Sequence, residues 1–135
     1  MLPQVERPGT LEKVITALQA VLKFLAPFET QEDWKRLTYY SDWMDYAPLP
    51  QKGVFRKDPL GTVWVRAEVS GVGPHPSGDC IAVLPVGYRP PVNIRLIVAD
   101  DTNYGSIEVT SSGRINHLIG ATGQVSLHFS FTTRV

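Results

Sequence analysis

The spacing of hydrophobic residues changes once along the chain, near Pro27. Before it, five aliphatic residues recur at alternating intervals of four and three: Leu11, Ile15, Leu18, Leu22 and Leu25. This repeat of about 3.5 residues is typical of a coiled-coil seam. It predicts a helix over residues 11–26 that begins after an N-cap at Thr10 and ends at Pro27. Val14 and Val21 broaden the apolar stripe, so three helices would bury it better than two.

This helix needs a surface that covers its stripe. At about sixteen residues it is close to the length at which an isolated helix is only marginally stable in water. Two hypotheses stay open: the stripes of three copies pack together in a homotrimer, or the helix docks on its own domain. We favour the trimer, because the apolar face is broader than a two-stranded seam needs.

Beyond Pro27 the apolar residues alternate with polar ones, as they do in half-buried strands. The clearest case is residues 62–69, where every second residue is valine or alanine. Further segments of this kind, bounded by Gly, Pro, Asn or Asp, are residues 80–84, 93–99, 105–110, 114–119 and 124–131. We expect a hairpin through residues 111–113, which end in glycine.

Many short strands without helices between them predict a mainly β fold, an antiparallel β-sandwich of the jelly-roll kind. The chain would then have two parts. Residues 1–27 are expected to form a leader and an amphipathic helix for oligomerisation or attachment, and residues 28–135 the β-sandwich head.

Composition excludes several classes of partner. The chain has 135 residues, 43% of them hydrophobic, which suits one compact domain with a short added element. Thirteen basic residues balance thirteen acidic ones, so no broad positive field is available for nucleic acid. Polar residues interrupt the most apolar stretch, so we expect no membrane insertion, and the start of the chain does not resemble a signal peptide. The single cysteine, Cys80, fits synthesis in a reducing cytosol.

The candidates for catalysis and metal binding are weak. His75, His117 and His128 are scattered and do not have the spacing of metal ligands. The nucleophile-type residues between His75 and Cys80 lie in a segment rich in Gly and Pro, which explains them as turn formers. We therefore expect no enzyme activity, no metal and no cofactor.

Aromatic residues gather between Trp34 and Phe55, and aspartates gather at residues 100–103. Aromatic clusters usually pack in a core or a subunit interface, and less often stack on sugars. The acidic segment falls where a hairpin tip is expected, and a surface turn explains it better than a calcium loop does. The candidate binding residues from both regions are Trp34, Trp43, Tyr46, Asp100, Asp101, Asn103 and Tyr104.

Several segments together resemble a known family. They are residues 34–38, 43–46, 55–66 and, most specifically, 84–90, which read Leu-Pro-Val-Gly-Tyr-Arg-Pro. The chain is similar, over about residues 34–131, to the C-terminal β-sandwich module of bacteriophage tail-fibre and minor tail (receptor-binding) proteins. The residues that match the family signature are Leu84, Pro85, Gly87, Tyr88, Arg89 and Pro90.

The resemblance implies a virion protein, assembled in the cytoplasm of the bacterial host. Its head would be trimeric, would attach to other virion proteins through the N-terminal helix, and would contribute to attachment to a saccharide or protein of the host surface. An alternative is a capsid or collar decoration, or head-fibre protein, with a purely architectural role. A soluble carbohydrate-binding module or an accessory module of a glycan hydrolase is a more distant alternative, which the aromatic cluster alone supports.

Overall fold

The computed structural model describes residues 8–29, 31–48, 51–71, 76–119 and 124–134. The chain divides into two compact units, Met1–Gln31 and Glu32–Val135, and each is described by itself. This division lies four residues after the boundary expected at residue 27, and the helix of the first unit extends to Glu29.

The first unit contains one described helix, α1, over Pro8–Glu29. The predicted helix is confirmed, but both predicted ends are wrong. Thr10 lies inside the first turn rather than at the N-cap, because proline at a helix start loses no intrahelical hydrogen bond, so the helix begins at Pro8. Pro27 lies in the last turn, where its missing N–H removes a single hydrogen bond and does not end the helix.

The five seam residues of α1 are all exposed within this chain. Their exposed fractions range from 42% for Leu25 to 62% for Leu22. Among the described residues, no helix has both the length and the apolar character required to cross a membrane.

In its described part, the second unit contains ten strands and no helix. The strands are β1 (Lys35–Arg36), β2 (Thr38–Tyr39), β3 (Met44–Asp45), β4 (Val54–Lys57), β5 (Thr62–Ser70), β6 (Asp79–Val83), β7 (Ile94–Asp100), β8 (Asn103–Val109), β9 (Arg114–Ile119) and β10 (Gln124–Thr132). The six segments predicted from alternation are confirmed as β5 to β10, with shifts of one or two residues at their ends. The hairpin through residues 111–113 is also confirmed, since Val109 pairs with Ile115.

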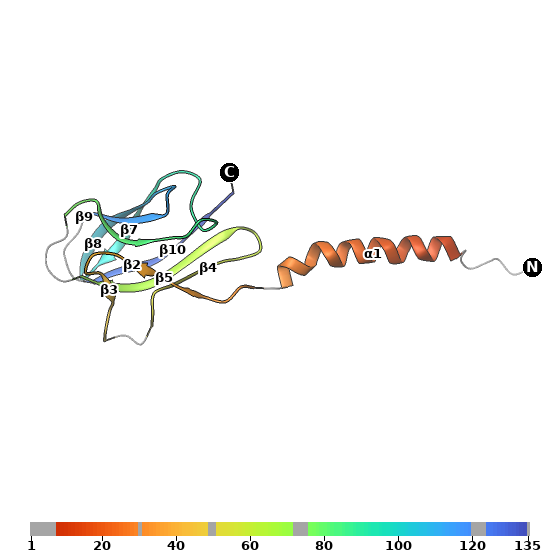
Figure 1. The fold of residues 1–135 in the computed structure, drawn as a ribbon, viewed down its shortest axis with the longest axis horizontal. Coiled ribbons are helices and arrows are strands. Elements are labelled where there is room, and N and C mark those ends of the chain that lie inside the picture. The colour runs from red at the N-terminus through yellow and green to blue at the C-terminus, as the bar shows by residue number, and fades with distance from the viewer. Residues whose placement is uncertain (1–7, 30, 49–50, 72–75, 120–123, 135) are drawn as a thin grey trace, which may run out of the picture. The chain divides into compact units, whose positions relative to one another are not determined.

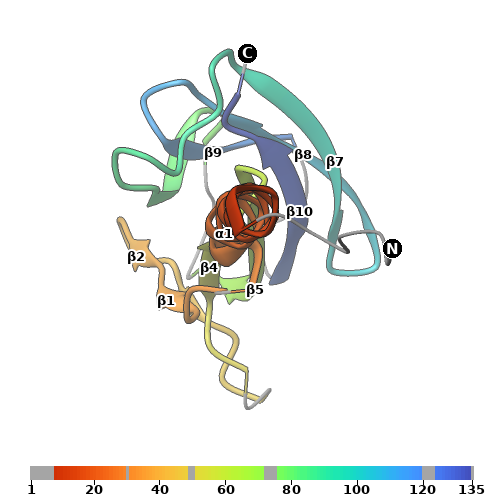
Figure 2. The same ribbon diagram turned by 90° about the vertical axis from the view of Figure 1, so that its right-hand side faces the viewer.

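All described strands belong to one antiparallel sheet (Figure 1). Its order is β1-β4-β5-β10-β7-β8-β9-β6-β2, with β3 added beside β5. β10 pairs with β5 along nine residues, but it meets β7 at the single pair Val125–Asp100. The sheet bends at this narrow junction, and Figure 2 shows it curving from β5 past β10 and β7 to β9.

One short segment brings the two ends of the sheet together. β1 pairs with β4 at one end, and β2 pairs with β6 at the other, with only Leu37 between them. The Leu37 amide also donates to the Gly53 carbonyl at 3.0 Å. We call residues 35–39 the clasp. The mainly β, antiparallel fold is confirmed, but its layers are halves of one nearly closed, barrel-like sheet rather than two separate sheets.

The inner face of the rolled sheet forms the hydrophobic core. Val63, Val65, Ala67 and Val69 of β5 are at most 3% exposed, as their alternation predicts. Large aliphatic residues of the other strands, and Leu84 just after β6, complete the core and are fully buried: Ile81, Leu84, Ile107, Val109, Ile115, Val125 and Leu127. Burial of each such aliphatic side chain contributes about 1.5–3 kcal/mol to the stability of the head.

The irregular segment after Trp34 is organised by one carboxylate, Asp45. It accepts hydrogen bonds from the Tyr39 hydroxyl at 2.6 Å, the Gly53 amide at 2.7 Å and the Arg36 guanidinium at 2.8 Å. It therefore links the clasp, β3 and the residues before β4. Alternation gave no signal for β1 to β4, because strands of two to four residues are too short to show it.

Candidate functional site

The hairpin between β7 and β8 carries the most exposed aromatic residue of the described chain, Tyr104. Asp100 pairs with Asn103, so Asp101 and Thr102 form the tip and the predicted hairpin is confirmed. Asp101 has a φ of 55°, a left-handed conformation that Asp tolerates better than most residues. Asp101, Asn103 and Tyr104 are exposed and close in sequence, so a large partner can reach all three.

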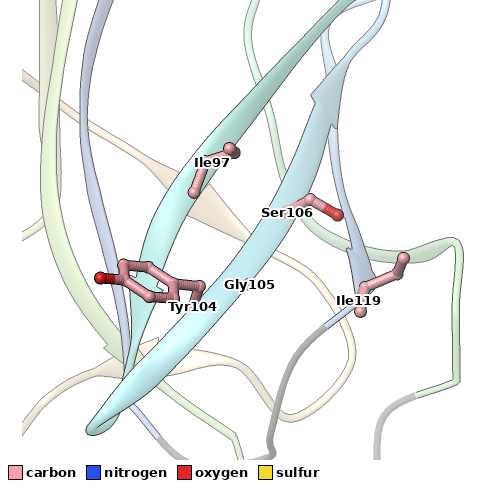
Figure 3. Close-up of a pocket in the computed structure, with 5 residues that line it drawn as sticks. All are labelled: Ile97, Tyr104, Gly105, Ser106 and Ile119. Atoms are coloured by element: carbon pink, nitrogen blue, oxygen red, sulfur yellow. The ribbon is translucent and has the colours of Figure 1, made fainter.

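A shallow apolar hollow lies beside this hairpin, on the outer face of β7, β8 and β9 (Figure 3). It has a volume of about 400 Å³ and is lined by Ile97, Tyr104, Gly105, Ser106 and Ile119. Ile97, Tyr104 and Ile119 are 80%, 85% and 72% exposed. Three such side chains on one face exceed the scattered apolar exposure that needs no explanation. The hollow therefore marks this face as a candidate contact surface.

Asp100 does not belong to this surface, contrary to the sequence prediction. Its side chain is fully buried, and its Oδ2 lies 3.2 Å from Nε2 of His117, which is also buried. The His117 ring packs against Trp43, with 5.7 Å between ring centroids. A polar pair in a core needs mutual hydrogen bonding, so Asp100 pairs inward rather than binding a partner.

Glycine at position 105 makes room for this inward carboxylate. A Cβ at Gly105 would lie 2.9 Å from Oδ2 of Asp100 and 2.7 Å from the backbone oxygen of Ile119. Both contacts are too close for any other residue. Gly105 therefore allows Asp100 to be buried directly beneath the apolar hollow.

The three aromatic candidates do not converge. Trp43 is 3% exposed, and its Nε1 donates to Asp79 at 2.9 Å, so it is a core residue and not a binding residue. Tyr46 is half-buried, with its amide bonded to the Glu68 carbonyl at 2.8 Å. Trp34 is half-buried against two arginines of the outer face. The cluster is thus dispersed between core and surface.

Residues 84–90, which include the turn around Gly87, pack against β4. Gly87 has a φ of 94°, and its carbonyl accepts a hydrogen bond from Lys57 at 2.9 Å. Tyr88 packs edge-on against Phe55 with centroids 5.1 Å apart, and Arg89 Nε donates to the Leu84 carbonyl at 2.9 Å. The contacts of Gly87 and Tyr88 hold the turn against β4, and that of Arg89 links the two ends of the segment.

In the part of the chain that the structure describes, no three His, Cys, Asp or Glu side chains could together hold a metal ion. Burial raises the pKa of the Cys80 thiol, which disfavours the reactive thiolate. His75, one of the histidines considered above, lies outside the described residues.

Sequence reasoning missed a polar face on β4, β5 and β10. It consists of Arg56, Trp64, Arg66, His128 and Ser130, together with Trp34. Alternation does indicate that Trp64 and Arg66 point away from the core. Their neighbours come from distant parts of the chain, and no local pattern reveals that they meet.

The architecture defines a class: an N-terminal helix followed by a mainly antiparallel β head. No protein-family model matches the sequence, and no curated protein matches it either. Among solved structures, the chain is similar to the receptor-binding protein (gp15) of Listeria phage PSA. The TM-score is 0.68 at 20% identity, over 98% of this chain and 82% of that chain. At this identity the likeness establishes a shared fold.

Proposed function

We propose that the chain is a structural protein of a bacteriophage virion, of the tail-fibre or spike type, whose β head contributes to attachment to the host surface. The observation that carries this proposal is the likeness in fold, over nearly the whole chain, to a phage receptor-binding protein. The resemblance of residues 84–90 to the tail-fibre signature supports the same class of protein.

The helix is proposed to join three copies of the chain and to connect them with other virion proteins. Its seam residues are exposed within one chain, and about five large apolar side chains in such a row need a partner in water. Two other copies of α1 would supply that partner with the same repeat. The head has no such need, because its core is already buried.

The surface proposed to contact the host is the hairpin tip with its apolar hollow. An exposed tyrosine such as Tyr104 provides a large, rigid contact area with a polar end, and tyrosine is enriched at interfaces. Asp101 and Asn103 beside it offer hydrogen-bonding groups at little cost, because they are already in water.

Binding to cells tests the proposal. The fluorescently labelled protein would be incubated with Listeria strains and with a panel of other bacteria, next to Tyr104→Ser. We expect saturable binding to one of these that Tyr104→Ser weakens, with Tyr40→Ser as a control, since Tyr40 is also exposed but lies away from the hollow. Absence of binding to all of them by a correctly folded trimer would favour the architectural alternative, a capsid or collar decoration.

A further inference from the structure

The outer face of β4, β5 and β10 arranges aromatic and cationic side chains in rows. The pairing of these strands places Arg56 opposite Trp64, and Trp64 opposite Ser130. In the next row, Arg66 lies opposite His128. These residues alternate with core residues along the same strands, so they all belong to the outer face.

Trp34 brings two positive charges together on this face. The guanidinium carbons of Arg56 and Arg66 lie 4.3 Å and 4.9 Å from the centroid of its ring. Such distances are those of cation–π contacts, which hold a guanidinium in place and leave its N–H groups available. Neither guanidinium makes a hydrogen bond or an ion pair to any residue that the structure describes. Two like charges are therefore held near each other without a carboxylate to balance them.

The neighbouring carboxylates are engaged elsewhere. Asp58 accepts hydrogen bonds from Nε1 of Trp64 at 3.1 Å and from the Leu60 and Thr62 amides at 2.9 and 3.0 Å. Glu68 accepts a hydrogen bond of 2.7 Å from Ser126, and lies 3.0 Å from Nε2 of His128. Each carboxylate is held by groups other than the two arginines, whose donors are left for an external anion.

A groove beside the arginines offers a second kind of contact. It has a volume of about 290 Å³ and is lined in part by Trp64, Arg66, His128 and Ser130. The Trp64 side chain is 45% exposed while its indole N–H is bonded to Asp58, which orients the ring. An oriented, open indole beside hydroxyl and imidazole groups suits the apolar face and the hydroxyls of a sugar ring.

We propose that this face binds a sugar unit that carries an oxyanion, a phosphate or a carboxylate. The oxyanion accepts hydrogen bonds from Arg56 and Arg66, and the ring packs on Trp64. Guanidinium groups bind such anions through paired, charge-assisted hydrogen bonds. The inference rests on the proposed function for the origin of the ligand, a charged glycan of a bacterial surface, but the binding itself is tested without cells.

The experiment uses the indole N–H signals of the three tryptophans in ¹⁵N NMR spectra of the full chain. Glucose 1-phosphate, glucuronate, glucose and inorganic phosphate would be titrated at constant pH and ionic strength. We expect glucose 1-phosphate or glucuronate to shift the Trp34 and Trp64 signals and not that of Trp43, which is buried. Glucose and inorganic phosphate alone should each bind about tenfold more weakly, because each lacks one of the two contacts.

Variants identify the groups responsible. Arg56→Gln/Arg66→Gln should abolish the response to the charged sugars, and Trp64→Ala should weaken it. Arg95→Gln is the matched control, because Arg95 is an exposed arginine on β7 with its own partner, Glu108, at 3.3 Å. A melting temperature close to that of the parent protein would show that each variant is folded.

Three outcomes of the titrations would overturn the proposal. Equal binding of inorganic phosphate and glucose 1-phosphate would show an anion site without a sugar contact. Equal binding of glucose would show that the arginines play no part, and no shift of either indole would exclude the site. Indole shifts by a protein that binds no cells would refute the proposed function and leave this site standing, whereas cell binding that survives the double arginine variant would place attachment elsewhere.

Discussion

The helix exposes its apolar residues, whereas the rolled sheet buries those of its inner face. In α1, Leu18 and Leu22 are 58% and 62% exposed, whereas in the sheet Val65 and Leu127 are 1% and 0% exposed. The sheet closes on itself and buries its own apolar face. A helix has no second face of its own to cover its stripe, and it depends on another surface.

From this contrast we expect folding and the proposed assembly to depend on separate residues. Substitutions in the sheet should change the stability of the head and leave assembly unchanged. Substitutions in the helix stripe should do the reverse. Each of the following experiments tests one side of that division.

The largest effect is expected from Leu18→Asp in the centre of the stripe. A carboxylate buried without a partner in a seam costs several kcal/mol per chain, and the cost is repeated in each copy. Light scattering should show a three-chain mass for the parent protein and a monomer for the variant, with the melting temperature of the head unchanged. The control is Gln19→Asp, next to Leu18 but outside the stripe. A variant that stays trimeric, or a parent protein that is monomeric at all concentrations, would contradict this role of the helix.

The converse substitution is Leu127→Ala on β10. Its side chain is fully buried, and removal of such a residue costs about 2–5 kcal/mol through lost burial and the cavity that remains. Denaturant unfolding should show this loss while the mass in native buffer stays that of the parent protein. Dissociation of the assembly by this variant, with the head still folded, would show that the head also contributes to the interface.

A smaller loss is expected from Asp100→Ala, which removes the partner of a buried histidine. His117 would then keep Nε2 without its 3.2 Å contact, and an unsatisfied buried group of this kind costs about 1–3 kcal/mol. The change is measured by denaturant unfolding. Asp101→Ala, at the exposed tip of the same hairpin, is the control and should lie close to the parent protein. Equal stability of both variants would mean that the buried pair contributes nothing.

The smallest effect is expected in the pH dependence of stability, through the Asp45 carboxyl that holds the clasp. Partial burial acts to raise the pKa of Asp45, but hydrogen bonds from Tyr39 and Gly53 and the charges of Arg36 and Lys52 outweigh it, so the pKa lies below its ordinary value. A lowered pKa means that the ionised carboxyl stabilises the fold above its unfolded-state pKa of about 3.9, and that this contribution is lost as the pH falls further. In Asp45→Asn the loss of stability between pH 5 and pH 2, followed by thermal unfolding, should be smaller than in the parent protein. An identical pH dependence in both proteins would refute this.

Regular alternation made most of the head predictable. Ile107 and Val125 could be assigned to the core, because period-two patterns are local and every second residue of a half-buried strand faces inward. The sequence pattern placed Asp100 on the exposed hairpin. Its burial depends on His117 in another strand and on the absence of a side chain at Gly105. These are contacts in space, and a pattern along the chain does not record them.

The outer face around Trp34 and Arg66 was also not predictable, because it too depends on contacts between distant parts of the chain. The alternation in each strand predicts which residues point outward. The strand order β4-β5-β10 decides which of these outward residues become neighbours. That order is set by long-range pairing, such as that of Arg66 with His128. A proposal about such a surface therefore requires the order of the strands and the register of their pairing.

The clasp has a consequence for how the chain can be cut and how it is made. Its two-residue strands occupy the free backbone edges of β4 and β6, which would otherwise present unpaired amides and carbonyls to solvent. Exposed edges of this kind recruit strands from other molecules, the first step of aggregation. During synthesis, the clasp emerges before either partner strand and can seal the sheet only after residue 83 has been added. A truncation that removes the helix therefore keeps both edges covered when it ends at Gln31, whereas one that extends to Tyr39 exposes both edges and also removes Leu37 from the core.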